Sequence, residues 1–69
     1  MLSFTKTENG LVFGIPGVPV IGRMWCTTTG VNRYRYHLEV NDVGDALMSA
    51  VLASFQYARS CGEIPLVSE

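Results

Sequence analysis

The sequence has only two cysteines and one histidine among its 69 residues, and this scarcity excludes several kinds of site. Cys26 and Cys61 lie far apart with no C-x-x-C pair, so zinc-finger spacing and thioredoxin-type redox chemistry are absent. We expect no metal and no other cofactor. We interpret both cysteines as buried free thiols, with a bridge between a strand and the helix end as the alternative.

Long apolar runs are missing as well. No stretch reaches the roughly 18 apolar residues that a membrane span requires. The N-terminal residues MLSFTKTENG also lack the basic start and apolar run of a signal peptide. These absences predict a soluble, cytoplasmic protein with no membrane partner.

Charge of either sign is sparse. Five Lys and Arg residues face six Asp and Glu residues, and the net charge of −1 provides no overall field to attract a polyanion. The hydrophobic content of 48% excludes a disordered chain, and a length of 69 residues predicts a single domain over residues 1–69. A core of this size seldom supplies more than about 3–5 kcal/mol, so a partner, a second copy or a disulfide is expected to add stability.

Asn9-Gly10 is the strongest turn signal, because both residues tolerate the positive φ of a type I′ turn. If Glu8 faces Leu11 across that turn, the hairpin has one apolar and one largely polar side. The apolar side holds Leu2, Phe4, Leu11, Phe13 and Ile15, and the other side holds Ser3, Thr5, Thr7 and Val12.

Proline and glycine in GIPGVP, residues 14–19, predict a turn along a sheet edge. This segment lacks the lysine and hydroxyl of a phosphate-binding loop and opens no helix. Residues 20–28 then form a second strand, and residues 33–40 return as a third after a turn at 29–32.

A helix should begin after Asn41 and Asp42, which are candidate N-caps, with Asp45 completing a weaker form of the capping box. Apolar and small residues then recur at helical spacing. They are Val43, Leu47, Ala50, Val51, Ser54, Phe55 and Ala58.

The predicted helix ends near Ser60 or Cys61, since Gly62 suits the left-handed position that follows a helix. The segment EIPLV, residues 63–67, is apolar enough to pack back on the core. We therefore predict an α+β fold, a three-stranded antiparallel sheet in βββα order with one C-terminal helix packed on one face.

Successive side chains of a strand alternate between its two faces, and RYRYHLEV, residues 33–40, alternates in polarity. Tyr34, Tyr36, Leu38 and Val40 are expected to face the helix, and Arg33, Arg35, His37 and Glu39 to face away. The tyrosines would then offer no stacking platform to a nucleobase.

The neighbouring strand buries one of two alternating sets. These are Val20, Gly22, Met24, Cys26 and Thr28, or Ile21, Arg23, Trp25 and Thr27. Burying an unpaired Arg23 costs several kcal/mol, more than the roughly 2–3 kcal/mol gained from Trp25. We favour burial of the first set, which requires a turn of odd length and leaves Arg23 and Trp25 on the open face.

The predicted partner-binding site follows from that parity, because Trp and Arg are over-represented among residues that carry binding energy. It comprises Arg23, Trp25, Arg33, Arg35 and His37. A secondary acidic patch of Glu39, Asp42 and Asp45 caps the helix or meets a basic groove on a partner.

Three alternatives remain for the open face. It could be an ordinary solvated surface, a small sheet-face module that binds nucleic acid, or the interface of a homodimer. Nucleic acid is the weaker partner on charge, because five basic residues are offset by six acids. A protein or protein complex is therefore the expected partner.

Catalysis is not expected. His37 and Glu39 are two residues apart on one strand, about 7 Å at Cα, and a flat sheet face provides no pocket that excludes water. Cys26 would join them as a nucleophile only if the turn parity were reversed.

As a short, single-domain, mixed α/β chain without a catalytic constellation, the sequence resembles the small anti-CRISPR proteins that phages and mobile elements encode. The resemblance covers size and element order and carries no residue. It implies a steric inhibitor in the host-cell cytoplasm, which binds a type I interference complex or its nuclease and blocks target DNA or nuclease recruitment. The expected function is thus a non-enzymatic, protein-binding inhibitor or adaptor.

Overall fold

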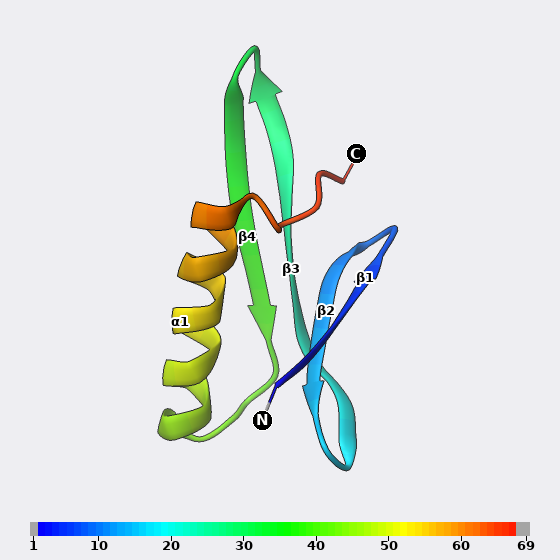
Figure 1. Ribbon diagram of the computed structural model, residues 1–69, viewed down its shortest axis with the longest axis vertical. Coiled ribbons are helices and arrows are strands. Elements are labelled where there is room, and N and C mark those ends of the chain that lie inside the picture. The colour runs from blue at the N-terminus through cyan, green and yellow to red at the C-terminus, as the bar shows by residue number, and fades with distance from the viewer. Residues whose placement is uncertain (1, 68–69) are drawn as a thin grey trace.

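A computed structural model describes residues 2–67, and in these residues four strands and one helix form an α+β fold (Figure 1). The strands are β1 (Ser3–Thr7), β2 (Gly10–Ile15), β3 (Val18–Gly30) and β4 (Arg33–Val40), and the helix is α1 (Asp45–Cys61). The sheet is antiparallel in the order β1-β2-β3-β4. The predicted class and C-terminal helix are confirmed. The predicted three strands are wrong, because the N-terminal hairpin adds two strands to the sheet.

The β1–β2 turn lies one residue earlier than predicted. Thr7 pairs with Gly10, so Glu8 and Asn9 form its tip. The Thr7 Oγ1 donates a hydrogen bond to the Gly10 carbonyl at 3.0 Å and accepts one from the Asn9 N–H at 3.1 Å. This side chain organises the turn in place of the predicted type I′ geometry. Each β1 residue pairs with a β2 residue two positions earlier than predicted. Because this shift is an even number, the paired side chains keep their predicted faces.

The β2–β3 connection is a tight turn at residues 16–17, where Gly17 has φ +87°. Gly14 lies so close to β3 that a Cβ there would stand 2.0 Å from the Pro19 carbonyl oxygen. The register shifts at this point, and β3 carries the extra residues. As a result Val20 is exposed and Ile21 is buried, the reverse of the expectation for this end of the strand.

The β3–β4 turn determines which of the two alternating sets of β3 side chains faces the core. Gly30 pairs with Arg33 across the tip, whereas Thr28 pairs with Tyr34, so Thr29 is the extra residue of a bulge. The bulge gives the connection an odd length beyond Thr28. The predicted odd turn is therefore confirmed.

The consequence appears at the centre of the sheet. Trp25 stands opposite His37, whereas the register without the bulge would place it opposite Leu38. Met24, on the other face of β3, is fully buried. The favoured parity is correct here, and Arg23 and Trp25 lie on the face away from the core.

The core lies between α1 and the inner face of the sheet, which is the face that α1 covers. Its buried members are Phe13, Ile21, Met24, Cys26, Val51, Ala58 and Ile64. The predicted helical stripe is confirmed at Leu47, Val51 and Phe55, which pack in or against this cluster. Ala50, which was predicted to join them, is exposed.

The helix begins later than predicted. Its N-cap is Gly44, with no side-chain cap, so neither Asn41 nor Asp42 caps it. The Asn41 N–H still donates to the Ile21 carbonyl at 2.7 Å, which ties residue 41 to β3 and delays the helix. The other end is as predicted: Gly62 follows Cys61 with φ 70°.

The C-terminal segment packs back on the core as predicted. The Cys26 N–H donates to the Pro65 carbonyl at 3.0 Å, and the Val67 N–H donates to the Cys26 carbonyl at 2.8 Å. This short parallel pairing occupies the edge of β3 beyond the end of β2 (Figure 1). Ile64 is thereby buried beneath it.

Beyond that pairing, the β3–β4 hairpin extends past the C-terminal end of α1 (Figure 1). Every residue from 28 to 36 is exposed, and we call this segment the arm. Among the described residues, no helix has the length and apolar character needed to cross a membrane.

Candidate partner-binding face

The outer face of the sheet, opposite α1, carries the predicted site. β3 contributes Arg23 and Trp25, and β4 contributes His37 and Glu39. Arg23 pairs directly with Glu39, and Trp25 pairs directly with His37. Since α1 is packed on the inner face, no described element covers these residues.

An aromatic and cationic stack lies at the centre of this face. The Trp25 and His37 rings are stacked, with centroids 5.0 Å apart and planes inclined by 15°. The Arg23 guanidinium lies 4.0 Å from the Trp25 ring centroid, in cation–π geometry. Trp25 is half-buried by these neighbours.

Arg23 connects three parts of the sheet. Its Nε lies 3.4 Å from Oε1 of Glu39 on β4, and its Nη1 donates to the Asn9 carbonyl of the β1–β2 turn at 3.1 Å. The same guanidinium covers Trp25. These contacts hold the long Arg23 side chain in one place, although an exposed ion pair of this kind contributes little to stability.

Thr27 anchors the other end of the stack. Its Oγ1 lies 3.0 Å from Nε2 of His37 in a hydrogen bond, and Thr27 itself is buried. Five side chains therefore form one connected series across the outer face. We call them the outer-face row: Thr27, His37, Trp25, Arg23 and Glu39.

The remaining predicted site residues lie outside this row. Arg33 and Arg35 belong to the arm. Glu39 pairs with Arg23, so it is not a free member of the predicted acidic patch. Asp42 lies in the loop after β4, and Asp45 lies in the first turn of α1, where it complements the helix dipole.

The conditional catalytic arrangement does not form. Cys26 lies on the inner face, away from His37, and its thiol donates to the Ile64 carbonyl at 3.7 Å. Burial raises the pKa of the Cys26 thiol, which disfavours the nucleophilic thiolate. Both cysteines are free, but Cys61 is exposed rather than buried as predicted. Within residues 2–67, no group of three or more His, Cys, Asp or Glu residues could hold a metal ion.

The sequence did not predict the exposure of the β4 tyrosines. Tyr34 and Tyr36 are on the α1 side of the strand, as expected, but they are 53% and 38% exposed. The Arg59 guanidinium lies 4.9 Å from the Tyr36 ring centroid. Tyr36 and Arg59 border a polar hollow of about 410 Å³ that is also lined by Gln56 and Ser60.

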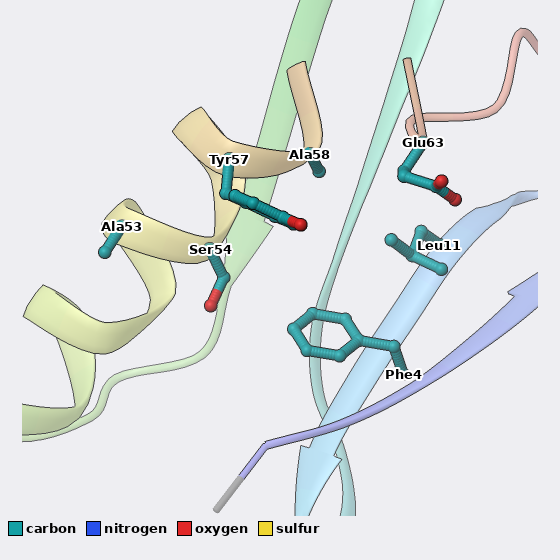
Figure 2. A pocket seen from close by; sticks show the side chains of 7 residues that line it. All are labelled: Phe4, Leu11, Ala53, Ser54, Tyr57, Ala58 and Glu63. Carbon is teal, nitrogen blue, oxygen red and sulfur yellow. The ribbon is translucent and has the colours of Figure 1, made fainter. Parts of the chain in front are cut away.

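A second feature that the sequence did not indicate is an apolar groove of about 460 Å³ between α1 and the β1–β2 hairpin (Figure 2). Its lining residues are Phe4, Leu11, Ala53, Ser54, Tyr57, Ala58 and Glu63. Hydrogen bonding with Cys61 raises the pKa of the Tyr57 hydroxyl at this groove. The groove exists because α1 covers only part of the inner face.

Comparison with known proteins found no relative: no protein-family model, curated protein or solved structure matches the chain. Function must therefore be argued from the chain's own surfaces.

Proposed function

We propose that this protein is a non-enzymatic protein-binding inhibitor or adaptor that contacts its partner through the outer face of the sheet. The observation that supports this most is the stack of Arg23, Trp25 and His37 on an uncovered face. Fixed aromatic and arginine side chains lose little conformational entropy on binding, and such residues commonly dominate interface energetics.

A protein partner suits the outer-face row better than a nucleobase does. The Trp25 ring already contacts Arg23 and His37, so a base would have to compete with them in order to stack. Glu39 also lies beside Arg23 and would repel a phosphate. A protein surface can instead pair with both the cation and the carboxylate.

The more specific proposal is steric inhibition of a type I interference complex or its nuclease. It rests on the resemblance in size and element order to small anti-CRISPR proteins. On this proposal the partner is a large protein complex, and the outer face blocks either target DNA or nuclease recruitment.

The test uses a purified type I interference complex, its nuclease and labelled target DNA. We expect the protein to co-elute with the complex or the nuclease and to reduce DNA binding or nuclease recruitment. Trp25→Ala should weaken this association by about tenfold or more. Leu52→Ala is the matched control, because it removes an exposed apolar side chain from α1.

Two results would contradict the proposal. Absence of co-elution, with DNA binding and nuclease recruitment unchanged, would refute the interference-complex partner. Sedimentation across a range of protein concentrations provides the second check. A dimer that dissociates in Trp25→Ala would instead show that a second copy covers the outer face.

A further inference from the structure

The arm concentrates positive charge in a protein that is negative overall. No Asp or Glu occurs between Glu8 and Glu39, whereas Arg33 and Arg35 stand on the arm. The single ion pair among the described residues joins Arg23 to Glu39, so the two arm arginines are free to meet an external anion. The arm, residues 28–36, therefore carries two positive charges and no negative charge.

Arg59 adds a third cation at the base of the arm. It lies in the last turn of α1 and its guanidinium stands 4.9 Å from the Tyr36 ring centroid. Asp45 lies in the first turn of α1, at the opposite end of the helix from Arg59, and Asp42 precedes it in the loop after β4, whereas Glu63 follows the same end of the helix as Arg59. A polyanion could thus approach the arm without meeting Asp42 or Asp45.

Aromatic rings stand beside these cations. Tyr34 is 53% exposed, and Tyr36 faces the polar hollow that Arg59 borders. β4 is an edge strand of the sheet. Its tyrosines lie on one face and Arg33 and Arg35 on the other, so all four side chains border the same free edge. Stacking platforms beside a basic track are the two elements of single-strand recognition.

We propose that the arm binds single-stranded nucleic acid, with a base stacked on Tyr34 and phosphates against Arg33, Arg35 and Arg59. The exposed rings favour a single strand over a duplex, whose bases are already stacked. Within the arm no carboxylate accompanies Arg33 and Arg35, and cations without carboxylates complement phosphates better than they complement a protein surface of mixed charge. This site is distinct from the outer-face row and does not depend on it.

The experiment measures anisotropy of a labelled mixed-sequence DNA 12-mer and the matching RNA, each against the duplex, at about 20 mM salt. We expect both single strands to bind more tightly than the duplex. With three phosphate contacts, the logarithm of the affinity should fall against the logarithm of salt with a slope of about −2, since each contact contributes about −0.7 for single strands.

The variants assign the site. Tyr34→Ala should weaken binding by about tenfold, while Tyr34→Phe, which keeps the ring, should bind like the wild type. Arg33→Ala, Arg35→Ala or Arg59→Ala should each reduce the salt slope. Lys6→Ala removes an equal charge from β1, away from the arm, and should leave binding within about twofold.

Circular dichroism of each variant checks folding, which the exposed positions should preserve. Three outcomes would overturn the proposal: no binding of either single strand at low salt, tighter binding of the duplex, or equal losses in Tyr34→Ala and Lys6→Ala. Binding that survives Trp25→Ala would confirm that the arm acts separately from the outer-face row.

Discussion

The two ends of the β3–β4 hairpin share one alternating pattern but have different surroundings. At one end the inner-facing Met24 is 0% exposed, while on the arm the inner-facing Tyr34 is 53% exposed. α1 and the C-terminal segment cover the first end, and nothing in the described chain covers the arm. An alternating strand therefore yields a core only where a second layer reaches it, and elsewhere it yields an exposed surface.

The largest expected effect on stability comes from shortening a buried side chain at the covered end of the hairpin. Met24→Ala should lower the free energy of unfolding by about 2–5 kcal/mol, because it removes transfer free energy and leaves a cavity. Tyr34→Ala on the arm should change it by less than about 0.5 kcal/mol. Urea denaturation of both variants measures the difference. Similar losses in the two variants would mean that the arm is as well packed as the core.

Glycines in β3 allow a second comparison of the two ends. A Cβ at Gly22 would stand 2.3 Å from the Glu39 carbonyl oxygen, so Gly22→Ala should cost about 1–3 kcal/mol through overpacking. A Cβ at Gly30 meets only the flexible Arg33 Cδ at 3.7 Å, so Gly30→Ala should be nearly neutral. Thermal unfolding of the pair checks this, and a neutral Gly22→Ala would show that β3 and β4 can separate there.

Local patterns predicted more of the covered end than of the arm. The cost of burying Arg23 was enough to choose the parity of β3, and Thr29 realises the odd turn that this choice requires. The outer-face placement of Trp25 followed from it, whereas that of His37 followed from the alternating polarity of residues 33–40. Their mutual stacking could not be predicted, because side-chain rotamers depend on neighbours across strands.

The errors arose where long-range geometry decides. The reversal at Val20 and Ile21 depends on how closely Gly14 approaches β3, which no local pattern reveals. The exposure of the arm depends on relative lengths. At about 1.5 Å per residue, the 17-residue helix is about 26 Å long, whereas the 13-residue β3 can extend to about 43 Å. One helix is too short to cover such a hairpin.

A smaller effect on stability is expected at Thr27, which lies at one end of the outer-face row. Thr27→Val keeps the shape of a buried side chain but removes the hydroxyl that bonds to His37, so it should cost about 1 kcal/mol. It should also loosen the His37–Trp25 stack and make Trp25 fluorescence easier to quench with acrylamide. Thr28→Val, one residue into the exposed arm, should leave both readings unchanged. Unaltered quenching in Thr27→Val would mean that this hydrogen bond does not position the stack.

The smallest expected effect on stability appears only at alkaline pH and involves Cys26. This residue lies where the covered end of β3 pairs with the C-terminal segment. Burial raises the pKa of this thiol above its ordinary value of 9.0, so the native state keeps a proton that the unfolded chain releases. The native state then binds more protons, and stability must fall as pH rises above that value.

Cys26→Ala should lose this part of the alkaline decline, while Cys61→Ala should retain it, because Cys61 is exposed. Cys61→Ala also removes the hydrogen-bond partner that raises the pKa of Tyr57, so both variants are compared in a Tyr57→Phe background, where their difference isolates Cys26. Denaturation midpoints at pH 8 and above provide the measurement. Parallel pH profiles in the two variants would show that water reaches Cys26 as freely as it reaches the arm, and that the C-terminal segment does not close the edge of β3.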